Sequence, residues 1–283
     1  MSNPTEPKRQ HYVPRFYLEY FAKVPDRKQL HVLEVKTGQA FVTNVTNVAV
    51  EGRLYNTPDG GSVEKDLNEI EGATAPAWAH LNDCTGLSQL CETDRQLIAG
   101  FVSSLIGRNP STLTDLGEIV GAIKKAFEDS TPTEELARQI EQFDRGKATR
   151  IMNDITKDSH RLVHYILNKK WILGTPPAGY LFPTSDNPVV RSNSFRHGHG
   201  TLGLASSGVE IYLPVSPQRV LMMVDVPQDL QQLCPEQVAF EYPHLLHVTS
   251  LLVWYSNRHL FNSDGRFEVA KGMKQAPKKL TSD

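Results

Sequence analysis

Two charged side chains with useful chemistry lie near the start of the chain, within a segment crowded with aromatic residues. His11 and Arg15 are four residues apart there. Histidine changes its charge near neutral pH, so His11 is a candidate catalytic acid or base. Arg15 is a candidate ligand for a phosphate or carboxylate group. The alternative is structural: the His11 ring bonds to the backbone, and Arg15 pairs with a nearby acid.

Two glutamates further along occupy one face of a predicted helix. Glu64, Asn68 and Glu71 are spaced by four and three residues, which places them close together at the edge of the apolar face. Glu64 and Glu71 are therefore candidate ligands for a divalent cation, and Glu71 is also a candidate catalytic residue. The alternative is a solvated acidic surface near a helix N-terminus, where the helix dipole favours negative charge.

The remaining candidates are Arg108 and the pair Asp186–Asn187. Arg108 follows a buried helical stripe and is a candidate phosphate ligand, or it simply bonds the last carbonyl groups of its helix. Asp186 lies between two short apolar runs and is a candidate metal ligand and catalytic residue, with Asn187 as a substrate contact. The alternative is a structural turn, in which these side chains bond their own backbone.

Composition limits the classes of protein that these residues can belong to. Of the 283 residues, 39% are apolar and 22% are charged, which is typical of a globular core, and a net charge of −2 indicates no general attraction to nucleic acid. The three cysteines form no CxxC pair, and the start of the chain has no apolar signal region. We therefore expect a cytoplasmic protein without membrane association. No ATP-loop, dinucleotide-binding or GxSxG motif is present.

The elements that must position these side chains follow the order β, then α, then β with one more helix. This order predicts an α+β fold, with an N-terminal hairpin or small sheet, a helical middle over about 62–170, and a C-terminal mixed β region with one further helix. We predict one domain over 10–269, a disordered tail over 1–9 and a basic tail over 270–283.

Periodicity gives the individual elements. The predicted strands are 30–35, 40–45, part of 48–55, 171–173, 180–182, 189–190, 210–213, 220–224 and a pair within 260–269. The predicted helices are 62–81 with Ser62 as N-cap, a helix capped by Thr93 or Asp94 and ending near Arg108, 114–127, 133–170, and a stretch over 235–256 that Pro243 kinks or delays.

Several blocks of the chain resemble one family. Gln10-His11-Tyr12-Val13-Pro14-x-Phe16-Tyr17-Leu18 is similar to the opening signature of an uncharacterised, mostly bacterial family, a domain of unknown function. Its further blocks resemble Val48–Tyr55, Glu64–Glu71, Arg108–Pro110 and Thr184–Val189. Glu19 departs from the pattern, since the family more often has a basic residue there. The resemblance implies membership without implying a reaction.

The residue set suggests a phosphodiester-cleaving hydrolase, for example a nuclease that acts in defence or as a toxin. Glu64, Glu71 and Asp186 would hold Mg²⁺ or Mn²⁺, His11 would transfer protons, and Arg15 and Arg108 would bind phosphate of a nucleic acid or nucleotide. The rival hypothesis is a protein that binds a ligand or partner without catalysis. In it, the acids and Arg108 pair in a buried network. The two hypotheses differ in whether these segments converge.

Overall fold

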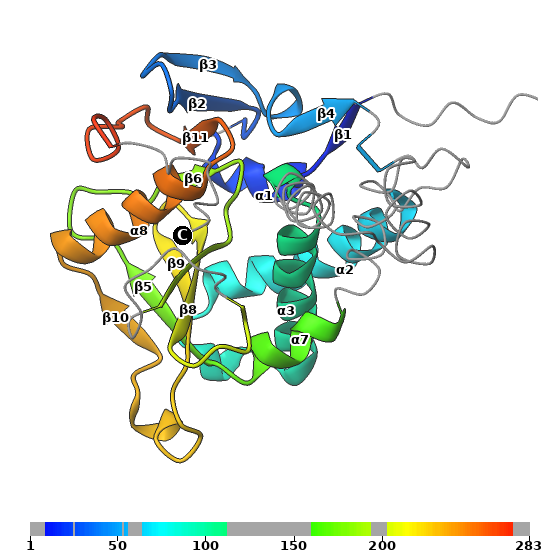
Figure 1. Ribbon diagram of the computed structural model, residues 1–283, viewed down its shortest axis with the longest axis vertical. Coiled ribbons are helices and arrows are strands. Elements are labelled where there is room, and N and C mark those ends of the chain that lie inside the picture. The colour runs from blue at the N-terminus through cyan, green and yellow to red at the C-terminus, as the bar shows by residue number, and fades with distance from the viewer. Residues whose placement is uncertain are drawn as a thin grey trace, which may run out of the picture.

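The computed structural model describes residues 9–24, 26–52, 54–55, 64–111, 160–193 and 203–273. It confirms the predicted α+β fold, with small N-terminal sheets, helices in the middle and a mixed C-terminal sheet with one helix (Figure 1). The helices are α1 (Arg15–Leu18), α2 (Glu64–Asp83), α3 (Glu92–Gly107), α7 (His160–Leu167) and α8 (Tyr242–Tyr255). Short 3-10 turns are Glu19–Phe21, Val45–Asn47, Leu87–Gln89 and Gln231–Leu233.

The larger sheet has five strands in the order β10-β5-β9-β8-β7. They are β10 (Gln237–Ala239), β5 (Lys170–Thr175), β9 (Arg219–Val224), β8 (Val209–Ser216) and β7 (Val190–Asn193). Only the β10–β5 pair is parallel in this sheet, so the sheet is mixed as predicted. The predicted strand at 180–182 is wrong: this stretch is irregular, and it lies between Pro177 and Pro183, which cannot donate ladder hydrogen bonds.

Helices cover both faces of this sheet (Figure 1). Along β9, Leu221 and Met223 pack with the core formed by α2 and α3, while Val220 packs with the core beneath α8. This alternation follows from the pleat of the strand, which sends successive side chains to opposite faces. The middle of the chain and the final helix therefore enclose the sheet as two separate layers.

A four-stranded antiparallel sheet joins the two ends of the chain. Its order is β3 (Ala40–Asn44), β2 (Gln29–Glu34), β11 (His259–Asn262) and β6 (Thr184–Ser185). The predicted hairpin is confirmed as β2 and β3. Because β11 lies between β2 and β6, the Thr184–Ser185 segment is held against the N-terminal part of the protein.

The aromatic N-terminal segment forms a strand and then a short helix. β1 (Arg9–His11) pairs with β4 (Val50–Gly52), with His11 opposite Val50. The strand predicted within 48–55 thus exists, but it pairs with the N-terminal segment rather than with the hairpin. The Tyr17 side chain is fully buried, with its ring 5.6 Å from that of Trp78 in α2. These contacts fix His11 relative to the helical core.

One helix end differs from the predictions, and another confirms the late start that Pro243 predicts. The N-cap of α3 is Cys91 rather than Thr93 or Asp94, because its Sγ accepts the Asp94 amide while the Asp94 carboxylate accepts the Cys91 amide. α8 begins at Tyr242, so Pro243 lies in the first turn, where its missing N–H costs nothing. Ser62 and the stretches 114–127 and 133–159 lie outside the described residues, as do 1–8 and 274–283.

Within the described ranges, no helix is both long enough and apolar enough to cross a lipid bilayer.

Candidate functional site

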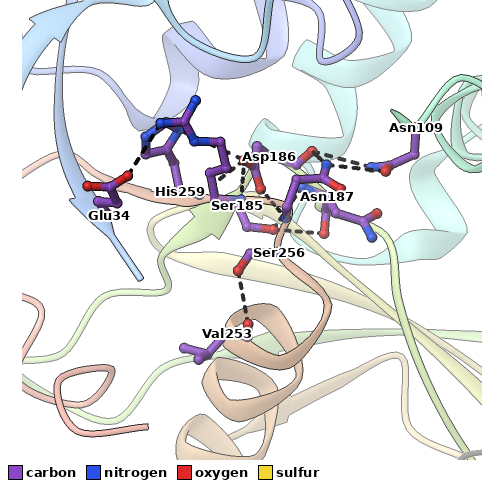
Figure 2. Close-up of polar contacts among 10 residues, drawn as sticks. Glu34, Asn109, Ser185, Asp186, Asn187, Val253, Ser256 and His259 are labelled. Atoms are coloured by element: carbon purple, nitrogen blue, oxygen red, sulfur yellow. Dashed lines mark hydrogen bonds and ion pairs between the residues drawn. The ribbon is translucent and has the colours of Figure 1, made fainter. Parts of the chain in front are cut away.

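Asp186 follows β6 and is the centre of a hydrogen-bond network (Figure 2). Its carboxylate is fully buried. Oδ1 accepts the amide of Asn257 at 2.7 Å, and Oδ2 accepts the amides of Arg258 at 2.8 Å and His259 at 3.0 Å. These amides belong to the end of the connection between α8 and β11 and to the first residue of β11. Asp186 therefore fastens this connection to the Thr184–Ser185 strand.

The protonation of Asp186 is set by two opposing effects. Burial raises the pKa of its carboxyl group to about 6, while the three backbone amides favour the ionised form and lower the pKa. All of these hydrogen bonds to the carboxylate come from main-chain groups. The neighbouring Asn187 also contacts main chain, since its Nδ2 donates to the carbonyl of Tyr255 at 2.9 Å. Both side chains therefore bond main chain that is distant in the sequence, which differs from the predicted turn in which they bond their own backbone.

Arg108 occupies the residue after α3 and is completely buried. Its Nη1 donates to Oε1 of Glu71 at 2.7 Å, and the guanidinium carbon lies 5.9 Å from the centre of the Phe101 ring. Nε and Nη2 of Arg108 are also buried, and neither has a hydrogen-bond partner among the described residues. The guanidinium group thus has one neutralising carboxylate and two unused donors.

His11 has a further unused polar atom and lies within electrostatic range of Arg108. Its Nε2 is buried and has no hydrogen-bond partner in the part of the chain that the structure describes. Burial is the main cause that lowers the pKa of His11 to about 4, and the positive charges of Arg15, Arg9 and Arg108 lower it further. The imidazole is consequently neutral at pH 7, and its Nε2 can accept a proton.

Two tyrosines join the segments around this histidine. The Tyr55 hydroxyl donates to the carbonyl of His11 at 3.2 Å. Burial raises the pKa of Tyr55; the positive charge of Arg108 opposes this rise, and the negative charges of Glu64 and Glu71 add to it. Tyr55 thus lies within electrostatic range of both the arginine and the two helix carboxylates.

Tyr12 makes a similar connection to Asp186. Burial raises the pKa of the Tyr12 hydroxyl, and the nearby charge of Asp186 adds to this rise. Asn109 completes the link, because its Nδ2 donates to the Asp186 carbonyl at 3.3 Å (Figure 2). The segments that contain His11, Glu71, Arg108 and Asp186 therefore converge in the folded chain.

The predicted residues come from converging segments, but they differ in their burial and in their contacts. His11, Arg15, Arg108 and Glu71 lie together as charged or polar groups, with Arg15 exposed and Arg108 buried. Within the described ranges, no three His, Cys, Asp or Glu side chains gather closely enough to hold a metal ion. The expected set of Glu64, Glu71 and Asp186 does not form one metal-binding group. The physical reason is that the Asp186 oxygens face the α8–β11 backbone instead.

The sequence motifs predict no role for Tyr55 or Asn109. Both belong to the blocks that carried the family resemblance, Val48–Tyr55 and Arg108–Pro110. Their function as connectors depends on partners far away in the sequence, Gln10 and His11 for Tyr55 and Asp186 for Asn109. Their membership of these blocks is the signal in the sequence that marks the two residues, but it does not identify their hydrogen-bond partners.

Comparison with known proteins gives one match. A family model described as "Protein of unknown function (DUF4238)" matches residues 9–265. No curated protein and no solved structure matches the chain.

Proposed function

We propose that this chain, which belongs to that family, hydrolyses phosphodiester bonds, with Arg108 as the phosphate ligand and His11 as the base. The observation that carries the proposal is the pair of unused donors on the buried Arg108, within electrostatic range of His11, whose Nε2 also has no partner among the described residues. Buried donors without a partner are costly, so their presence at a motif residue favours a ligand that supplies acceptors.

The chemistry of Arg108 favours an oxyanion with more than one oxygen. Nε and Nη2 lie on one edge of the planar guanidinium group, the arrangement that binds two oxygens of the same phosphate or carboxylate. Glu71 uses the other side through Nη1, and so holds the guanidinium in place. The exposed side chains of Arg9 and Arg15 extend the positive charge toward solvent, which suits the backbone of a nucleic acid or a nucleotide.

The proposed reaction uses His11 in its neutral form. Nε2 of His11 removes a proton from a water molecule, and the resulting hydroxide attacks phosphorus. The bond from phosphorus to the leaving oxygen breaks, that oxygen takes a proton from solvent, and the imidazolium of His11 returns its proton to solvent. Arg108 neutralises the charge that grows on the non-bridging oxygens.

The proposal includes no step through Mg²⁺ or Mn²⁺. The three carboxylates expected to hold the ion do not gather, and three main-chain amides occupy the Asp186 carboxylate. The proposal places the protein in the cytoplasm, where its thiols Cys84, Cys91 and Cys234 would stay reduced.

A second candidate function is binding without catalysis. Two observations favour binding without catalysis, the Glu71–Arg108 pair and the Asp186 network. In both, buried polar groups bond other parts of the protein, as expected if they stabilise the fold. In this case the segment around His11 closes over a bound phosphate group without transferring protons.

Hydrolysis of bis(p-nitrophenyl) phosphate and of single-stranded RNA and DNA tests the proposal, with EDTA in one arm and Mn²⁺ in another. We expect turnover by the wild type in both arms and its loss in His11→Gln and Arg108→Gln. Arg258→Gln is the matched control, since this side chain is 70% exposed and pairs with Glu34 at the surface. Phosphate binding that depends on Arg108, without turnover of any substrate, would establish the second candidate instead.

A further inference from the structure

A hollow on the C-terminal part of the molecule lies apart from the residues discussed above. It is lined by Thr249 of α8 and by residues from the stretches 179–183 and 262–270, and no lining residue belongs to the site around Arg108. The hollow offers about 60 Å³ to water-sized groups. Because one water molecule needs at least about 10–15 Å³ by this measure, the hollow has room for a small organic molecule.

One of the residues that line the hollow, Thr249, has a polar group without a hydrogen-bond partner among the described residues. Thr249 in α8 is fully buried, and its Oγ1 has no hydrogen-bond partner in the described part of the chain. A threonine inside a helix commonly satisfies its hydroxyl by bonding to the preceding turn. Thr249 does not, and a buried hydroxyl without a partner is unfavourable. A ligand that enters the hollow deeply enough to reach Oγ1 would satisfy this hydroxyl.

The remaining lining selects the chemistry of that ligand. Leu181, Pro183 and Phe267 supply apolar surface, which suits a short hydrocarbon body. Arg266 is already neutralised, because its Nε pairs with the Asp264 carboxylate and its Nη1 donates to the Gly179 carbonyl at 3.1 Å. The exposed Glu268 is left as the excess charge of the lining, so an anion is disfavoured.

We infer that this hollow binds a small uncharged molecule with one hydrogen-bonding end, of the amide or alcohol class. The polar end bonds Oγ1 of Thr249, and the short apolar body contacts Leu181 and Phe267. The site is independent of the proposed phosphodiester chemistry, since it shares no residue with it.

Acetamide and acetate are suitable probes because they have nearly the same shape and differ in charge. Titration of the ¹⁵N-labelled full chain with acetamide should give saturable amide shifts that centre on Gly179, Asn262 and Phe267. Acetate should bind roughly tenfold more weakly, as expected for one unfavourable charge contact. Absence of a saturable, localised response to acetamide would overturn the inference.

Thr249→Val tests the hydrogen bond, because valine keeps the shape and removes the hydroxyl. We expect roughly tenfold weaker acetamide binding, the effect of one lost hydrogen bond. Thr74→Val is the matched control, since Thr74 is equally buried in α2 but its Oγ1 already donates to the Leu97 carbonyl at 3.5 Å. Equal acetamide affinity in Thr249→Val and Thr74→Val would contradict the inference.

Glu268→Gln gives a test that does not depend on the stability of the Thr249 variant, because it changes an exposed side chain. The inference requires the affinity for acetate to rise toward that for acetamide. An unchanged ratio of the two affinities would show that the lining does not select against charge, and would overturn the assigned ligand class.

Discussion

Oε1 of Glu71 lies 2.7 Å from Nη1 of Arg108, and this ion pair joins the middle of α2 to the residue after α3. The Arg108 side chain is fully buried, whereas that of Glu71 is 23% exposed. The pair therefore neutralises a charge that cannot reach water, while Nε and Nη2 on the other edge of the guanidinium have no hydrogen-bond partner among the described residues.

Removing the carboxylate of this pair should be costly. Glu71→Ala leaves the buried Arg108 charge uncompensated, and we expect the free energy of unfolding to fall by about 3 kcal/mol. Urea denaturation measures this loss. Glu69→Ala in the same helix is the control, because its pair with Lys65 is exposed at 3.8 Å and should contribute less than about 1 kcal/mol. Equal losses in the two variants would show that burial of Arg108 does not make the pair important.

Asp186 should matter for stability more than for catalysis. Asp186→Ala leaves three main-chain amides without their acceptor, and we expect a loss of at least about 3 kcal/mol in the free energy of unfolding. Asp225→Ala is the control, since the exposed Asp225 accepts one amide, from Gly208. Phosphodiester turnover per folded molecule should be unchanged in Asp186→Ala. A loss of turnover in fully folded protein would restore the catalytic role predicted from the sequence.

His11 should make stability depend on pH in a defined direction. Its pKa falls from 6.5 to about 4 on folding. Between these values the unfolded chain binds a proton that the folded chain does not, so the free energy of unfolding rises with increasing pH. His11→Gln lacks this contribution. The difference between wild type and His11→Gln should therefore increase from about pH 4 to pH 6.5 and stay constant above it.

Subtraction of the variant isolates the histidine from Asp186, whose raised pKa acts in the opposite direction and is present in both proteins. A constant difference across this range would mean that His11 is not shielded from protonation. The same low pKa predicts that kcat/KM falls only as the pH approaches about 4, since kcat/KM reports the free enzyme.

Tyr17 should couple the N-terminal segment to β6. Its hydroxyl lies 2.6 Å from Oγ1 of Thr184 and donates to the Pro214 carbonyl at 2.8 Å. Tyr17→Phe leaves these buried groups without a partner, and we expect the free energy of unfolding to fall by about 1–3 kcal/mol. Tyr242→Phe, at a ring that is 46% exposed, should change it little. Thermal unfolding of the two variants gives the comparison.

Replacement of the cysteine N-cap of α3 by serine should stabilise the protein. Sγ of Cys91 accepts the Asp94 amide at 3.4 Å, whereas a serine hydroxyl is a stronger acceptor and a preferred N-cap. We expect Cys91→Ser to raise the free energy of unfolding by about 0.5–1 kcal/mol. Cys234→Ser also removes a free thiol, but Cys234 follows a 3-10 turn as its C-cap and is not a helix N-cap, so this change should not raise the free energy of unfolding. Destabilisation by Cys91→Ser would mean that the thiol is retained for its packing.

Elements whose signals are local follow from the sequence alone. The β2–β3 hairpin and α2 follow from side-chain periodicity, and the α+β order follows from how such elements succeed one another. The motif residues His11, Glu71 and Arg108 were also identifiable, because their charges stand out beside apolar stripes. A local pattern predicts an element when the interactions that form this element are also local in the sequence.

Which of these residues act together depends on contacts between segments that are far apart in the sequence. β4 pairs with β1 rather than with the hairpin, and this pairing brings His11 to Tyr55. Asp186 turns its oxygens to the α8–β11 backbone, because a buried carboxylate is most stable where amides can satisfy it. Arg108 meets Glu71 from 37 residues away and keeps two donors unused among the described residues. Hydrogen-bond partners at such separations are set by packing, which no local pattern specifies.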